Sequence, residues 1–296
     1  MTERQPPHLT DRGPEPHRPV RIERWSPEGR LAGDDVVAAE EPLQVVLDGE
    51  PFVVVMRTPG HDLELVLGLL FVEGLIRSRS DVAEGAVAAS GLPEDAAAFP
   101  IRALPEAENL VELRLVRPHA KDDRVGWQRN LIASSACGIC GAAALDALRD
   151  DLPPLPPGPT FTSSAITAMA PALRAAQATF ELTGGLHAAG LFDTAGHLLH
   201  IREDVGRHNA VDKLVGRALL SGELPLHERA LMLSGRTSFE LAHKAVAAGV
   251  PLMAAVSAPS SLAVHVAHTF GLTLVGFLRG ERFNVYAGGE RIADPA

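Results

Sequence analysis

Hydrophobic residues in the first half of the chain form short runs that predict a small mixed domain. Residues 43–47 and 52–57 are rich in β-branched residues and flank Asp48-Gly49, a dipeptide typical of hairpin turns. The strongly apolar stretch 62–76 predicts a helix that is buried on nearly all sides. Apolar and polar residues alternate over 110–116, which predicts a further strand. Residues 80–108 carry only weak signals.

The second half alternates short apolar runs with helical patterns, and this predicts a sheet covered by helices. The predicted fold class is therefore α/β in this half and α+β for the chain overall. Pro171 is expected to disturb the first of the helices. The expected strands are 186–192, 198–202, 229–233, 251–256, 272–278 and 283–286, and the expected helices are 164–179, 207–220, 239–248 and 262–270.

Polar and proline-rich stretches set the expected domain limits. Residues 1–20 are polar and rich in proline, which predicts a disordered tail, with folding starting near Val20. Five prolines between 152 and 159 predict a stiff connection. We therefore expect an N-terminal α+β domain at 21–130, a cysteine loop with a short helix and linker at 131–160, and a C-terminal domain at 161–296.

Composition excludes several classes of protein. The contents of 46% hydrophobic and 22% charged residues are those of a globular chain. A net charge of −10 argues against binding to nucleic acid or membrane surfaces, and 4% aromatics offer no stacking platform for single strands. We find no transmembrane run and no apolar core of a signal peptide. The expected location is the cytoplasm, where thiols stay reduced.

The chain has only two cysteines, Cys137 and Cys140, in a C-x-x-C pair. Gly138 and Gly141 follow them, which allows a tight turn and close approach of a partner. The helical pattern at 142–148 places the sulfurs near a helix start, where the dipole favours a thiolate. Such a pair can bind a metal, cycle through a disulfide or carry sulfur as a persulfide. The alternative is two small residues buried in a core.

Polar residues also collect where predicted strands end and helices begin. Ligands of open α/β sheets bind beyond the carboxyl ends of strands, and free N–H groups at helix starts suit phosphates. The alternative is ordinary helix capping. Neither a P-loop nor a dinucleotide fingerprint occurs. The clusters are 183–187, 202–209, 233–238 and 257–261, and the arginines that can bind a pyrophosphate are Arg207, Arg236, Arg279 and Arg282.

Three histidines, His187, His208 and His243, are candidate polar site groups. A closed zinc site usually needs four Cys or His ligands, and no histidine pair is suitably spaced to join the C-x-x-C. The H-x-E signature of zinc deaminases is missing from the sequence. No metal is therefore expected.

Several motifs, taken in order, resemble those of the formate dehydrogenase accessory sulfurtransferases, the FdhD family. The resemblance covers about residues 22–288. The matching segments are MRTPG at 56–60, SACGICG at 135–141, TGGLHAA at 183–189, REDVGRHNAVDKLVG at 202–216, SGRTSFELAHKAVAAGVP at 234–251, SAP at 257–259 and GLTLVGFLRGERFNVY at 271–286.

The resemblance implies a sulfur carrier that takes persulfide sulfur from a cysteine desulfurase. The sulfur passes to molybdenum in the bis-molybdopterin guanine dinucleotide cofactor, a transient ligand, for the catalytic subunit of formate dehydrogenase. It also implies a homodimer and a cytidine-deaminase-like C-terminal domain without zinc chemistry, joined to the N-terminal domain by a mobile cysteine loop. Cys137 is the implied carrier and Cys140 its partner thiol. The implied cofactor residues are Phe277, Leu278, Arg279, Gly280, Glu281 and Arg282, with His187, Arg207 and Arg236 as further candidates.

Three other functions fit parts of the pattern. A dithiol oxidoreductase would cycle Cys137 and Cys140 through a disulfide. A zinc-binding scaffold would hold metal without transferring sulfur. A nucleotide-binding regulator would tolerate the loss of both cysteines.

Overall fold

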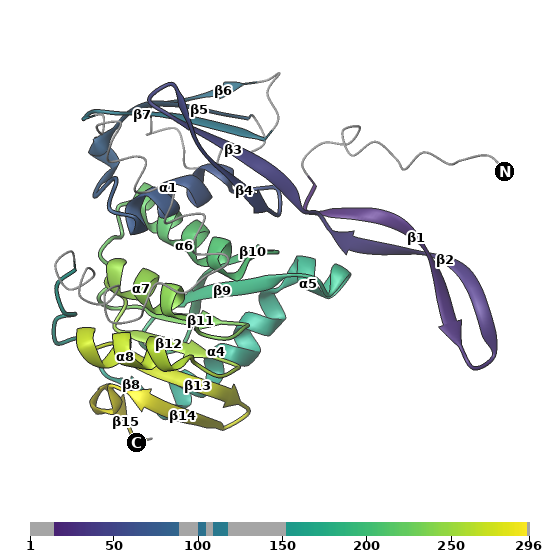
Figure 1. Cartoon of the computed structure of the whole chain (residues 1–296). Coiled ribbons are helices and arrows are strands. Elements are labelled where there is room, and N and C mark those ends of the chain that lie inside the picture. Colours follow the sequence, from purple (N-terminus) through teal and green to yellow (C-terminus); the bar gives the residue numbers. More distant parts are fainter. Residues whose placement is uncertain (1–14, 89–99, 105–108, 118–151, 295–296) are drawn as a thin grey trace.

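The computed structural model describes residues 15–88, 100–104, 109–117 and 152–294. These residues form two packed units and a projecting arm (Figure 1). Between the sheets of the two units lie helices α1 (Asp62–Val72) and α6 (Arg207–Ser221). Cys137, Cys140 and most of the expected connection 131–160 lie outside the described residues.

The first unit is a five-stranded sheet with the order β4-β3-β7-β5-β6. The predicted hairpin is confirmed, because β3 and β4 pair antiparallel. Asp48 (φ 53°) and Gly49 (φ 79°) form its turn in the left-handed conformation that tight hairpins need. The weak stretch 80–108 contributes two strands. The bounds are β3 Glu41–Leu47, β4 Glu50–Arg57, β5 Val82–Ala88, β6 Ile101–Leu104 and β7 Leu110–Leu115, with a 3-10 turn at Arg79–Asp81.

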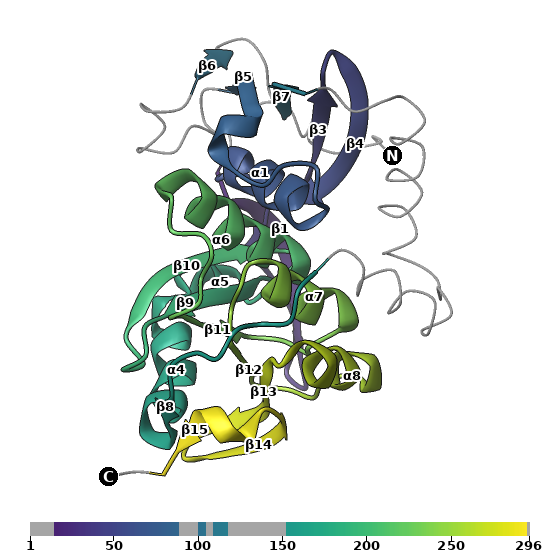
Figure 2. The same cartoon turned by 90° about the vertical axis from the view of Figure 1, so that its left-hand side faces the viewer.

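Helix α1 is buried on nearly all sides, as its composition predicts. Every residue except Phe71 is buried, including the charged Asp62 and Glu64. It ends at Val72, earlier than the expected residue 76, and Gly74 (φ 75°) then turns the chain. The sheet covers one side of α1 and α6 the other, so the helix has no solvent face (Figure 2).

The second unit is a six-stranded sheet with the order β10-β9-β11-β12-β13-β14. Strands β11, β12 and β13 are parallel to one another. One core lies between the sheet and helices α6, α7 and α8, and another lies between the opposite face and α4. The strands are β9 His187–Phe192, β10 Leu198–Asp204, β11 Ala230–Leu233, β12 Leu252–Ala255, β13 Thr273–Arg279 and β14 Arg282–Ala287, and the helices are α4 Ser163–Ala176, α5 Ala178–Thr183, α7 Phe239–Ala247 and α8 Ser261–Phe270.

This arrangement confirms the predicted alternation of strands and helices. One detail is wrong, because α4 continues through Pro171 and ends only at Ala176. The Pro171 side chain is exposed. Two short strands, β8 Phe161–Thr162 and β15 Ile292–Ala293, pair beside the main sheet. The 3-10 turn Gly289–Arg291 comes directly before β15.

No helix in the described part is long and apolar enough to cross a membrane.

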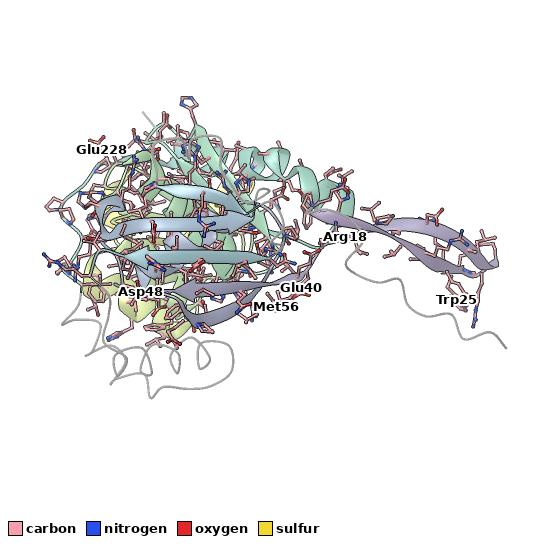
Figure 3. The ribbon with its side chains drawn as sticks, turned by 90° about the horizontal axis from the view of Figure 1, so that it is seen from above. Arg18, Trp25, Glu40, Asp48, Met56 and Glu228 are labelled. Carbon is pink, nitrogen blue, oxygen red and sulfur yellow. The ribbon has the colours of Figure 1, made fainter. Side chains whose placement is uncertain are left out.

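A separate two-stranded arm projects from the body (Figures 1 and 3). It consists of β1 His17–Ser26 and β2 Gly29–Ala38, which pair along their whole length. Strand β1 begins at His17, before the expected start of the folded part near Val20. The arm's polar composition concealed both strands, because their order comes from pairing with each other and not from a buried face.

The two units join where α1 crosses α6 at two glycines. A Cβ on Gly68 would lie 1.8 Å from the carbonyl oxygen of Asp212, and a Cβ on Gly216 would lie 1.8 Å from that of Glu64. The helix backbones therefore touch, and only glycine fits at either position.

Candidate functional site

The predicted polar clusters meet at one edge of the six-stranded sheet. His187, at the start of β9, pairs in register with Asp204, at the end of β10. Ser234, at the end of β11, binds the same strand: its N–H donates to the Ala188 carbonyl (3.0 Å), and its Oγ accepts from the Ala188 N–H (2.8 Å). Three of the four clusters thus lie side by side.

The fourth cluster joins through the turns that follow β11 and β12. The Thr237 N–H donates to the Ala258 carbonyl (3.2 Å), and the Ser260 N–H donates to the Thr237 carbonyl (2.9 Å). The Phe277 N–H, near the end of β13, donates to the Ser257 carbonyl (3.2 Å). The starts of α6, α7 and α8 are therefore collected at this edge, as the carboxyl ends of the parallel strands require.

Helix capping accounts for only one of these three helix starts. The Ser260 Oγ accepts from the Ala263 N–H (3.2 Å) and caps α8. The residues before α6 and α7, Gly206 and Ser238, make no side-chain cap. The first N–H groups of α6 remain suited to an anion, whereas in the first turn of α7 the Glu240 carboxylate accepts from its own N–H and from Ser238.

The four predicted phosphate-binding arginines form no close ion pair in the described part, although the Arg207 charge helps to lower the pKa of Glu240. Arg207, Arg236, Arg279 and Arg282 make no ion pair or side-chain hydrogen bond with another described residue. Arg207 Nε and Thr237 Oγ1 are also buried without a hydrogen-bond partner there. Buried unsatisfied polar atoms are rare in native structures. Both lie beside the uncapped helix starts, which favours a polar ligand at this edge.

Residues 277–282 form the hairpin between β13 and β14. Arg279 and Arg282 are cross-strand partners, so both side chains leave one face, as a shared ligand requires. Gly280 (φ 56°) and the exposed Glu281 make the turn. Phe277 adopts φ 52° at a bulge and is 40% exposed. Leu278 instead packs in the core beneath α4, so it supports the hairpin from inside.

The three candidate histidines, one of them in the middle of α7, all have lowered pKa values. Burial, followed by the nearby Arg207 charge, lowers the pKa of His187. Burial, with Lys244 and Arg207 nearby, lowers the pKa of His208 to about 4, and its Nε2 lies 3.1 Å from Ser238 Oγ. Burial and Lys244 lower the pKa of His243 to about 4. Among the residues that the structure describes, no group of three or more His, Cys, Asp or Glu side chains could hold a metal ion.

These two depressed pKa values predict an acid-sensitive fold. Between pH 6.5 and about 4, His208 and His243 bind protons in the unfolded chain but stay unprotonated in the folded protein. Acid therefore favours the unfolded chain over this range. Their contribution to stability is therefore complete above pH 6.5 and is lost as the pH falls towards 4. Urea unfolding from pH 7.5 to 4.5 should show a smaller decline for His208→Gln than for wild type, whereas His265→Gln, at an exposed position, should follow wild type. Parallel curves for wild type and His208→Gln would contradict this.

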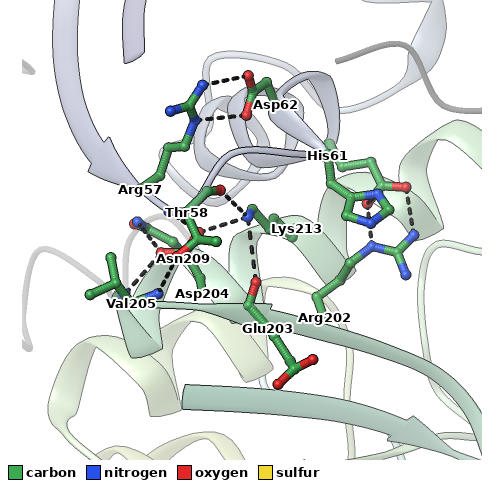
Figure 4. A network of polar contacts seen from close by, with 12 residues as sticks. Arg57, Thr58, His61, Asp62, Arg202, Glu203, Asp204, Val205, Asn209 and Lys213 are labelled. Carbon is green, nitrogen blue, oxygen red and sulfur yellow. Dashed lines mark hydrogen bonds and ion pairs between the residues drawn. The ribbon is translucent and has the colours of Figure 1, made fainter. Parts of the chain in front are cut away.

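A buried polar network that the sequence did not reveal lies directly beside this edge and joins the two units (Figure 4). Asp204 is fully buried, and its Oδ2 lies 2.7 Å from Lys213 Nζ and 3.2 Å from the Thr58 N–H. Its Oδ1 accepts from the Gly206 N–H and from Asn209 Nδ2. One carboxylate thus ties the loop after β4 to the start of α6.

Two further ion pairs complete the network. Arg57, 1% exposed, donates from Nε and Nη2 to the two carboxylate oxygens of Asp62, both at 2.8 Å. Arg202 donates in the same paired way to Glu64 across the two units. Burial would raise the pKa of Glu64, but hydrogen bonds from Arg202 and His61 lower it to about 2. The sequence did carry one sign of this network, because two acidic residues, Asp62 and Glu64, stand inside an otherwise apolar helix.

The motifs at 56–60 and 202–216 therefore shape the joint between the units, while those at 183–189, 234–251 and 257–259 shape the sheet edge. The assignments of Cys137 as carrier and Cys140 as partner thiol lie outside the described residues and stay predictions.

Known proteins with similar sequences cover nearly the whole chain. The model of the FdhD/NarQ family matches residues 38–293. The sulfur carrier protein FdhD of Streptomyces avermitilis is 50% identical over 266 residues, covering 88% of this chain and 89% of the relative. That of Mycobacterium tuberculosis is 43% identical over 274 residues, covering 92% and 97%. A crystal structure of a formate dehydrogenase accessory protein from Desulfotalea psychrophila superposes with a TM-score of 0.71 at 25% identity, covering 94% of this chain and 100% of that one.

Proposed function

Because the chain belongs to the FdhD/NarQ family of sulfur carrier proteins, we propose that it carries sulfur as a persulfide on Cys137. The donor is a cysteine desulfurase. The acceptor is the molybdenum of bis-molybdopterin guanine dinucleotide, which is then used by the catalytic subunit of formate dehydrogenase. The protein is in this sense a sulfurtransferase of the cytoplasm.

The observation that carries the acceptor proposal is the set of unpartnered groups at the sheet edge. Arginines elsewhere, such as Arg57 and Arg202, bind carboxylates through paired bonds. In contrast, the arginines at 207, 236, 279 and 282 are left without such partners among the described residues. Guanidinium groups bind phosphate oxygens through the same paired geometry. A guanine dinucleotide, with its pyrophosphate, fits these arginines and the uncapped start of α6.

The sulfur chemistry follows from the C-x-x-C pair. The Cys137 thiolate attacks the terminal sulfur of the donor persulfide, which forms a Cys137 persulfide and releases the donor thiolate. Cys140 then attacks Cys137 Sγ and expels hydrosulfide for the metal, leaving a Cys137–Cys140 disulfide. The two thiols supply the two electrons that reduce the sulfane sulfur. A cellular thiol reductant restores the pair.

The same proposal includes finer structural features. A second copy of this chain completes a homodimer. Residues 161–296 take a cytidine-deaminase-like arrangement, whereas the implied cysteine loop lies outside the described residues. The nucleotide is a transient ligand, so no cofactor is held permanently.

Calorimetric titration with GDP tests the acceptor site. Arg279→Ala and Arg207→Ala should each weaken GDP binding about tenfold to a hundredfold, because a hydrogen bond to a charged group contributes about 1.5–3 kcal/mol. Arg114→Ala, on the opposite unit and paired with Glu84, is the matched control and should bind like wild type. Equal affinities for all four proteins would leave the arginines as surface charge and refute the site.

A further inference from the structure

The imidazole of His208, at the sheet edge, has one nitrogen that no described residue binds. Its Nε2 lies 3.1 Å from Ser238 Oγ and 3.8 Å from Glu240 Oε2, so the side chain reaches from the start of α6 to the start of α7. Its Nδ1 makes no hydrogen bond within the described part of the chain. The side chain is 33% exposed, so a bound molecule can reach this nitrogen.

The hydrogen bonds of Ser238 determine where this imidazole carries its proton. The Ser238 hydroxyl has one proton and donates it to the Glu240 carboxylate, which can only accept while it is ionised. Ser238 Oγ therefore accepts from His208, and the proton of the neutral ring lies on Nε2. Nδ1 is left with an electron pair that can only accept a hydrogen bond.

His208 stays neutral near pH 7 because its surroundings disfavour a second proton. Burial, followed by the charges of Lys244 and Arg207, lowers its pKa to about 4, although Glu240 acts in the opposite direction. Lys244 is held in place by Asp212, one turn further along both helices, at 2.6 Å. A neutral imidazole with a bare Nδ1 does not suit phosphate oxygens, since both would only accept. This nitrogen therefore needs a hydroxyl or N–H donor from a ligand.

The charges at the two helix starts favour different parts of a ligand. At α6, Arg207 and the uncapped N–H groups favour phosphate oxygens. At α7, the Glu240 carboxylate is 35% exposed and repels them. A nucleotide whose pyrophosphate binds at α6 therefore places an uncharged part beside His208 and Glu240.

The ribose is the uncharged part that follows the pyrophosphate in a guanine nucleotide. Arg207 and His208 are consecutive residues, so their side chains reach neighbouring groups of one ligand. The ribose is joined to the phosphates through its C5′ atom, and its hydroxyl groups are the hydrogen-bond donors nearest to them. The N–H groups of guanine lie beyond the ribose.

We propose that His208 Nδ1 accepts a hydrogen bond from a ribose hydroxyl of the bound guanine nucleotide, which makes the site select nucleotides that carry this hydroxyl. Ser238 is a positioning residue, because it fixes the proton on Nε2 without touching the ligand. The inference rests on the proposed function for the identity of the ligand.

Calorimetric titration of the full chain with GDP and with 2′,3′-dideoxy-GDP, which lacks both hydroxyl groups, tests this contact. Wild type should bind GDP about tenfold more tightly than the analogue, because the analogue leaves Nδ1 without a donor. His208→Leu should bind GDP about tenfold more weakly than wild type and should bind both nucleotides equally. His265→Leu, at an exposed position of α8, is the control and should keep the wild-type ratio of affinities.

Ser238→Ala tests the positioning role with a smaller change. The Ser238 side chain does not cap α7, so the helix should keep its fold. Without the hydroxyl the ring proton can move to Nδ1, and the ratio between the two affinities should fall below that of wild type. An equal weakening of both nucleotides, with the ratio unchanged, would show that Ser238 acts only on the structure and would refute the proton assignment.

The titrations also separate a failure of this contact from a failure of the acceptor site. GDP binding that depends on Arg279 but shows no preference over the dideoxy analogue would overturn the contact alone. A tenfold preference that persists in His208→Leu would do the same. IDP lacks the exocyclic amine of guanine, so a preference for GDP over IDP that is lost in His208→Leu would assign His208 to the base and overturn the ribose contact. A wild type that binds neither GDP nor its analogue would refute the acceptor site itself.

Discussion

Cys137→Ala is expected to abolish persulfide loading and to reduce formate dehydrogenase activity in cells to the level of a strain that lacks this protein. The carrier thiolate forms the only covalent link to the transferred sulfur, and no other side chain in the chain except Cys140 has a thiol. The loss should therefore be nearly complete and not graded. Intact mass after loading and formate oxidation in cell extracts are the two readouts.

Cys140→Ala is the matched cysteine control for this prediction. It should still load sulfur on Cys137, because the first transfer needs only one thiolate. It should release the sulfur slowly, because no internal thiol is left to expel hydrosulfide. Full formate dehydrogenase activity with Cys137→Ala would show that Cys137 is not the carrier.

Gly216→Ala is expected to destabilise the protein by about 3 kcal/mol, the upper part of the range for overpacked sites. The new Cβ would lie 1.8 Å from the Glu64 carbonyl oxygen, a backbone atom that no side-chain rotation can move aside. Helices α1 and α6 would have to separate, which also strains the Arg202–Glu64 pair across the joint. Denaturant unfolding measures the loss.

Gly289→Ala serves as the control for this change. Its Cβ would meet only the Val285 side chain at 3.6 Å, an ordinary contact, so stability should stay within about 0.5 kcal/mol of wild type. A Gly216→Ala protein that is as stable as this control would show that the helices do not touch. Gly68→Ala, on the facing helix, should reproduce the large loss.

The sequence predicts the second unit well because each element there has a local signal. Strands β11 and β12 are short apolar runs ended by serine and glycine or proline, and α7 and α8 follow with helical periodicity. The sequence failed at β5, whose residues VAEGAVA have little β propensity and are ordered by pairing with β6 and β7. Strands β1 and β2 of the arm were also not predicted, because they too are ordered by pairing with each other.

The candidate site likewise has one part that could be predicted from the sequence and one part that could not. The sheet edge was predictable, since strand ends and helix starts can be read from the pattern. The joint was not, because Arg57, Asp204 and Lys213 look like ligand-binding residues until the fold shows what they contact. Thr58 and Asp204 are 146 positions apart, and no local pattern indicates their contact.

The central claim, that this chain carries sulfur on Cys137, is tested most directly by intact-mass analysis after incubation with a cysteine desulfurase and cysteine. The account predicts that wild type gains the mass of at least one sulfur atom, that a reductant removes it, and that Cys137→Ala gains none. A wild-type mass that stays unchanged, or that falls by two hydrogens as Cys137 and Cys140 form a disulfide without added sulfur, would contradict the account and favour the dithiol oxidoreductase.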